Sequence, residues 1–170
     1  MLKRPWSVAP SVGAVLFGLT TDGIAARAPA RMSQAPAAPR DQLVRDLERL
    51  TEGLLFMSES DFPLAVVLWR QPGGTPNARR LAALTGEPHA DLAEMMTIDE
   101  FFASAATPRP WHDAEERAIA RRYAVLVHYL KTRLTGVRVF RFGRTTIHAY
   151  VVGTTRNGDW IGLATTQIET

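Results

Sequence analysis

Two carboxylates in one short loop are the residues of this chain best suited to chemistry. Glu59 and Asp61 alternate with Ser58 and Ser60 in the sequence SESD, between two apolar segments. Carboxylates this close can act as general acid and base when a pocket pushes their pKa values apart. The same residue types also form ordinary solvated turns. Because the sequence demonstrates no pocket, both interpretations stay open at this point.

The other residues with catalytic potential do not form a recognisable site. Cysteine is absent, and no serine lies in a G-x-S-x-G elbow. Gly73-Gly74 lies between prolines and not before a helix, unlike a phosphate-binding turn. No HExxH pair or three-ligand spacing occurs among the histidines, which are far apart: His89, His112, His128 and His148. We therefore expect a protein that is not an enzyme and holds no cofactor or metal of its own.

Two apolar segments are expected to position the SESD loop. A helix is predicted from Asp41 to about Ser58, with a single apolar stripe formed by Leu43, Leu47, Leu50 and Leu54. After the loop, Leu64–Trp69 is a run of six apolar residues, too short for an independent helix, and predicts a buried central strand. The carboxylates would then lie on a short tether between two core elements.

Three further helices are predicted from capping residues and periodicity. Ala78–Leu84 forms one or two turns closed by Gly86. A helix over Ile98–Ala105 follows the capping box of Thr97 and Glu100. The longest helix, Ala114–Thr135, opens with a second capping pair, Asp113 and Glu116, and stops at Gly136. Between the last two helices, the rigid Pro-x-Pro segment Thr107–Trp111 orients Trp111.

The end of the chain predicts a three-stranded meander over Val137–Phe142, Thr146–Gly153 and Trp160–Ile168. Asn157-Gly158 is a two-residue hairpin signal between the last two strands. The first strand alternates poorly, which indicates a bulge. With Leu64–Trp69 these strands make a four-stranded, largely antiparallel sheet. We expect an α/β/α sandwich in which the long helix and the Asp41–Met57 helix cover one face each.

The charge distribution argues against a nucleic-acid-binding domain. The 170 residues, 46% hydrophobic, suit one domain with a substantial core. The formal charge of +3 is uneven, because residues 1–40 carry +4 and the remainder about −1. The segment from Glu87 to Glu100 contains five carboxylates and no lysine or arginine. An acidic surface favours a basic protein partner over nucleic acid.

Residues 1–40 are predicted to lie outside the folded domain, which occupies residues 41–170. A basic start, a short apolar run and an alanine-rich exit are typical of a secretory signal peptide. The alternative is a disordered leader with the functional chain starting at Met32. The first implies a periplasmic or secreted protein, and the second a cytoplasmic one. No stretch has the ~20 apolar residues of a membrane span, and no membrane partner is expected.

Several sequence blocks resemble the nuclease A inhibitor family. They are GLLFMSESDFP followed by VVLW, then TPRPW and EE, and finally YVVGTT and GDWIGLATTQIET at the end of the chain. The resemblance covers roughly residues 41–170 and is weakest over Gln71–Glu94. It implies an α/β/α sandwich that binds a non-specific, divalent-metal-dependent DNA/RNA endonuclease one to one and blocks its active site.

The resemblance also implies roles for individual residues. Glu59 corresponds to the glutamate inserted at the nuclease metal centre, and Thr170 to the terminal threonine that also reaches toward that metal. Trp111 corresponds to an interface tryptophan. Less defined contacts are implied for the neighbours of these residues: Ser58, Ser60, Asp61 and Glu169. Pro110 departs from the family pattern, which has an acidic residue there.

Two other functions remain compatible with the sequence. One is an α/β/α protein-binding module with a different partner. The other is a hydrolase that uses Glu59 and Asp61 as its acid–base pair.

Overall fold

The computed structural model describes residues 39–56, 59–88 and 93–169. The predicted leader therefore lies outside the described residues, except that Pro39 and Arg40 already belong to the first helix. The helices are α1 (Pro39–Thr51), α2 (Ala78–Thr85), α3 (Ile98–Ala106) and α4 (Ala114–Arg133). The strands are β1 (Leu55–Phe56), β2 (Phe62–Pro63), β3 (Ala65–Trp69), β4 (Glu94–Met96), β5 (Thr135–Phe142), β6 (Thr146–Thr154) and β7 (Trp160–Ile168). No described helix is both long enough and apolar enough to cross a membrane.

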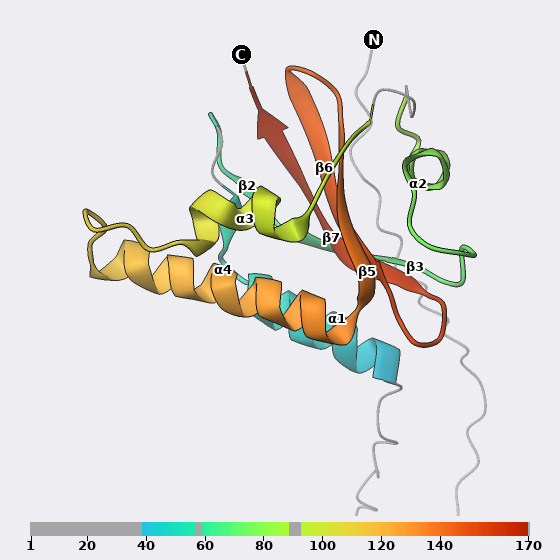
Figure 1. The fold of residues 1–170 in the computed structure, drawn as a ribbon, viewed down its shortest axis with the longest axis horizontal. Helices are drawn as coiled ribbons and strands as arrows, with labels where there is room; N and C mark the ends of the chain where they lie inside the picture. The colour runs from blue at the N-terminus through green and yellow to red at the C-terminus, as the bar shows by residue number, and fades with distance from the viewer. Residues whose placement is uncertain (1–38, 57–58, 89–92, 170) are drawn as a thin grey trace, which may run out of the picture. The chain divides into compact units, whose positions relative to one another are not determined.

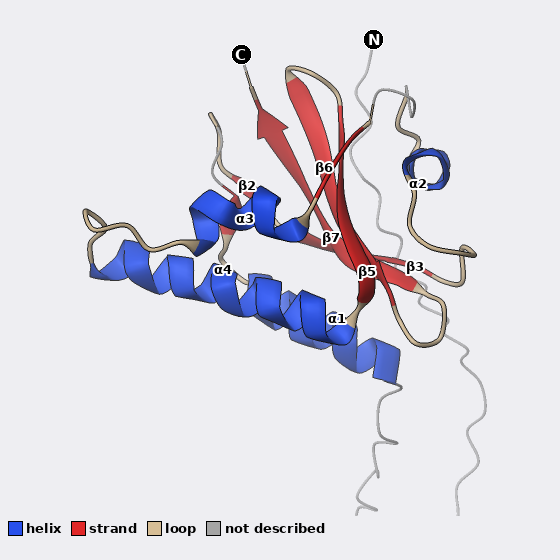
Figure 2. Cartoon of the chain, viewed as in Figure 1, coloured by secondary structure: helices blue, strands red, loops and turns tan. Residues whose placement is uncertain are grey.

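The described strands form one antiparallel sheet and one small ribbon (Figures 1 and 2). The sheet has five strands in the order β3-β7-β6-β5-β4. The ribbon pairs β1 with β2 and lies beside the end of β7. The mixed α and β class and the helices on both faces of the sheet are confirmed. The fifth strand, β4, was not predicted, because three residues carry too little pattern to be recognised.

Three helices share one face of the sheet. Leu47 of α1, Phe102 of α3 and Leu126 of α4 belong to one buried cluster with Val151 and Leu163 of the sheet. The opposite face carries a second cluster, in which α2 packs on aromatic side chains: Leu81 and Ala82 with Phe140, Phe142, Tyr150 and Trp160. The prediction that α1 and α4 cover opposite faces was therefore wrong. Amphipathic periodicity requires each helix to bury its apolar stripe, but it does not select the face of the sheet.

The strand at Trp69 lies at an edge of the sheet, and the prediction of a central strand was wrong. β3 pairs with β7, and its side chains are half-buried or exposed. Val66 and Leu68 pack against the α1–α3–α4 cluster, whereas Trp69 packs against the α2 cluster. Because side chains on both faces have partners, this edge strand has the continuous apolar sequence that is typical of central strands.

The starts of α2, α3 and α4 agree with the prediction, whereas α1 begins at Pro39, two residues before the predicted start at Asp41, and ends earlier than predicted. Both capping boxes are present, at Thr97 with Glu100 and at Asp113 with Glu116. α1 stops at Thr51, well before Ser58, because Gly53 adopts a left-handed φ of 67° and turns the chain into β1. Gly136, also left-handed at φ 63°, lies inside β5 at a register shift, which confirms the predicted bulge. The Asn157-Gly158 signal marks a turn, although the connection spans residues 155–159.

Candidate functional site

The SESD loop is the connection of the β1–β2 ribbon. Leu55 pairs with Pro63 and Phe56 with Phe62, so the chain reverses direction between these pairs. Glu59, Ser60 and Asp61 are all exposed. Ser58 lies outside the described residues. The two carboxylates therefore project from a short hairpin.

The base of this hairpin is fixed to two helices. The ring of Phe56 stacks on that of Phe101 in α3 at a centroid distance of 4.6 Å and meets Phe102 edge-on at 5.8 Å. The Tyr123 hydroxyl of α4 donates a hydrogen bond to the Leu55 carbonyl at 2.8 Å. Burial, supplemented by the charge of Asp61, raises the pKa of Tyr123 to about 12, so the hydroxyl remains a donor at neutral pH. The ribbon thus has a rigid support, even though it contains only two residue pairs.

The tip of the hairpin meets the end of β7. The Glu59 amide donates to the Ile168 carbonyl across 3.4 Å. The next residue, Glu169, donates its amide to the Thr145 carbonyl at 2.9 Å. The structure therefore brings Glu59 and Glu169, which are separated by most of the domain, to the same place. Thr170 lies outside the described residues.

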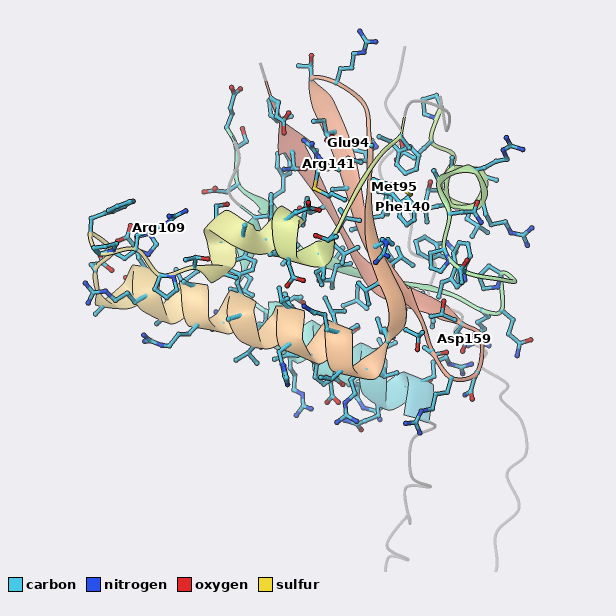
Figure 3. The ribbon with its side chains drawn as sticks, viewed as in Figure 1. Glu94, Met95, Arg109, Phe140, Arg141 and Asp159 are labelled. Atoms are coloured by element: carbon cyan, nitrogen blue, oxygen red, sulfur yellow. The ribbon has the colours of Figure 1, made fainter. Side chains whose placement is uncertain are left out.

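Arg141 is a residue of this region that sequence reasoning did not identify. Its side chain, only 13% exposed, donates hydrogen bonds to Gln167 and Glu169 at the end of β7 and to Glu94 of β4. Figure 3 shows Arg141 and Glu94 on one side of the sheet, with Phe140 and Met95 on the other. The sequence did contain a signal for Arg141, because a charged residue interrupts the alternation of a mostly apolar strand. We interpreted this interruption only as a bulge.

Trp111 lies in the loop between α3 and α4, and its side chain is 75% exposed. The loop is closed by reciprocal bonds: the Arg109 amide donates to His112 Nδ1, and the His112 amide donates to the Arg109 carbonyl, both at 3.1 Å. The Arg109 guanidinium lies 6.0 Å from the centre of the indole ring. At this exposure Trp111 is a surface residue and not part of the core. Figure 3 shows Arg109 apart from Arg141, so the tryptophan belongs to a separate loop.

The arrangement presents two exposed carboxylates on an anchored hairpin. Among the described residues, no group of three or more His, Cys, Asp or Glu side chains could hold a metal ion. Glu59 and Asp61 both face solvent, and an acid–base pair needs an environment that separates the two carboxyls. An exposed carboxylate on an anchored hairpin can instead be inserted into a site on another molecule.

Fold and surface together define a mixed α/β domain that presents an exposed acidic hairpin and an exposed tryptophan. Comparison with protein families gives the more specific assignment. Residues 41–170 match the model of the nuclease A inhibitor-like protein family. The match covers most of the chain, and the chain belongs to this family. Among curated proteins, no sequence matches it.

Proposed function

We propose that this protein inhibits a non-specific, divalent-metal-dependent DNA/RNA endonuclease, with Glu59 and Thr170 directed at the metal ion of the nuclease in a one-to-one complex. Family membership supports an inhibitor of a nuclease. The observation that carries the residue assignment is the bond between the Glu59 amide and the Ile168 carbonyl. It joins the carboxylate loop to the segment that leads directly to Thr170.

The chemistry requires only one well-placed oxygen anion. The metal ion of such a nuclease has open positions that accept phosphate oxygens and water. Hard divalent cations prefer oxygen ligands, so a carboxylate delivered there replaces the phosphate of the substrate. Asp61 and Glu169, both exposed, add negative charge beside Glu59. This charge complements a nuclease surface that is basic where it binds nucleic acid.

Trp111 supplies a second contact in this proposal. Large aromatic side chains dominate the energetics of many interfaces. The closed Arg109–His112 turn holds the indole outside the domain, where it is available to a partner. The hairpin would then block the metal, while Trp111 adds affinity.

A plasmid-degradation assay with purified metal-dependent endonucleases tests the proposal. Glu59→Gln keeps the shape of the side chain and removes the anion, and deletion of Thr170 removes the second group. We expect each to raise the inhibition constant about tenfold or more, because loss of a central contact commonly costs ~2 kcal/mol. The matched control is Glu48→Gln, which removes an exposed carboxylate from α1 and should inhibit like the wild type.

Two results would count against the proposal. Inhibition by Glu59→Gln and by the Thr170 deletion at wild-type strength would exclude the assigned site. A chain that inhibits none of the nucleases and instead recovers a different partner in a pull-down would point to a binding module of another kind.

A further inference from the structure

One guanidinium connects three separate segments at the end of the sheet. Arg141 Nε donates to Gln167 Oε1 at 3.1 Å, one Nη donates to the Glu94 carboxylate at 2.5 Å, and the other donates to the Glu169 carboxylate. Glu94 is the direct neighbour of Arg141 on β4. Gln167 and Glu169 lie beyond β6, at the end of β7. The arginine therefore connects the edge strand β4 to Gln167 and Glu169 at the end of β7.

The sheet register permits this reach. The residue opposite Arg141 on β6 is Ala149, and the residue opposite Ala149 on β7 is Thr165. Ala149 is small and fully buried, so the long side chain of Arg141 can lie across β6 toward Gln167. A planar guanidinium has donors pointing in several fixed directions, which an ammonium group does not. The site is therefore specific for arginine.

The position of the Glu169 side chain depends on its ion pair with Arg141. The Glu169 and Glu94 side chains are 52% and 60% exposed, whereas Arg141 is only 13% exposed between them. Without the guanidinium, the two carboxylates would lose the cation that both of them contact, and the repulsion between their like charges would be less compensated. The segment that follows β7 would then keep its backbone bond from Glu169 to Thr145 but lose its side-chain attachment.

We propose that Arg141 is a positioning residue for inhibition: by holding Gln167 and Glu169, it fixes the segment from Gln167 to Glu169 beside the Glu59 hairpin. This inference rests on the proposed function for its consequence, but its structural part does not need the nuclease. Ile168 links this segment to the hairpin. It lies between Gln167 and Glu169 in the sequence, and its carbonyl accepts a hydrogen bond from the Glu59 amide.

The first test measures amide hydrogen exchange in Arg141→Met and Arg141→Lys by NMR. We expect exchange of the Glu169 amide to accelerate about tenfold in Arg141→Met, since local opening is governed by local contacts. Arg141→Lys should give a smaller increase. Amides of Ile161 and Leu163, in the first half of β7 and away from Glu169, should stay unchanged, which separates a local effect from general destabilisation. The matched control is Arg138→Met, which removes an exposed arginine of the same strand that donates to the carbonyl of Val137.

The second test uses the endonuclease that the wild-type chain inhibits most strongly in the plasmid assay. Arg141→Met should raise the inhibition constant about tenfold, equivalent to ~1.4 kcal/mol. Glu169→Gln changes an exposed side chain, and it probes the same contact if Arg141→Met fails to fold. If Arg141 acts through Glu169, the double variant Arg141→Met/Glu169→Gln should inhibit no more weakly than the weaker inhibitor of the two single variants.

Each outcome has a defined meaning. Unchanged exchange at Glu169 in both Arg141→Met and Glu169→Gln overturns the inference, whatever the nuclease result. Faster exchange with undiminished inhibition also overturns it, because the end of the chain would then not need to be fixed. Glu59→Gln tests the proposed function without involving Arg141. Failure of the proposed function can therefore be distinguished from failure of the positioning role of Arg141.

Discussion

Two tryptophans illustrate how surroundings decide the role of a residue type. Trp160 is fully buried in the α2 cluster, and its indole nitrogen donates to the Gly74 carbonyl at 2.9 Å. Trp111 is held at the surface, between an arginine and a histidine of its own loop. Burial gives the first side chain a structural role. Exposure leaves the second available for binding.

The two tryptophans should therefore respond in opposite ways to truncation. Trp111→Ala should change the free energy of unfolding by no more than about 0.5 kcal/mol, as is usual for surface positions. It should weaken inhibition by ~2 kcal/mol, as is typical of an interface anchor. Trp160→Ala should destabilise the fold by ~3–5 kcal/mol. Denaturant unfolding and inhibition constants check both; strong destabilisation by Trp111→Ala would contradict the assignment.

At the scale of elements, α4 supports two different neighbours through two tyrosines. Tyr123 donates to the Leu55 carbonyl of β1, and so holds the hairpin that carries Glu59. Tyr129 donates to the Asp46 carboxylate of α1 at 2.7 Å, away from that hairpin. The helix therefore holds the hairpin through a bond to a backbone carbonyl and holds α1 through a bond to a carboxylate.

Replacing each tyrosine by phenylalanine separates support of the site from support of the fold. Both Tyr123→Phe and Tyr129→Phe should lower the free energy of unfolding by about 1 kcal/mol or more, the usual contribution of a hydrogen bond of this kind. Only Tyr123→Phe should also raise the inhibition constant, because only it loosens β1. Equal inhibition by the two variants would show that the anchoring of the hairpin is irrelevant to binding.

At the scale of the whole molecule, buried phenols make stability depend on alkaline pH. Burial raises the pKa of Tyr123 and of Tyr129 to about 12, and the hydrogen bond to Asp46 adds to the shift of Tyr129. Burial and the hydrogen bond to Glu87 also raise the pKa of Tyr150. The folded protein thus retains the neutral phenols to higher pH than the unfolded chain, in which tyrosine titrates near about 10.

The sign of the effect follows from these raised pKa values. The stabilising contribution of the neutral phenols is complete below about pH 10 and is lost as pH rises toward about 12. We expect the unfolding free energy to fall steeply over that interval, and less steeply in Tyr123→Phe. Denaturant titrations at about pH 8, 10 and 11 measure this. A stability that stays constant through about pH 11 would contradict the burial of these groups.

Local signals in the sequence determined the starts of α2, α3 and α4 and most of the strands of the sheet. The two capping boxes at Thr97 and Asp113 and the bounds of β7 follow from residues a few positions apart, and the structure confirms them. The β1–β2 hairpin was not predicted, but the SESD motif did indicate the polar loop that connects its strands, because the polar residues interrupt two apolar segments. Such features depend on interactions within a single turn or strand.

Only the tertiary structure decided how these elements are combined. It placed α1 and α4 on the same face, put β3 at an edge, and joined the Glu59 amide to Ile168. It also made Arg141, an apparent irregularity of its strand, the residue that holds the end of β7. A periodic pattern shows that a surface must be buried or a charge paired, but the partner lies far away in the chain and is selected by packing of the whole domain.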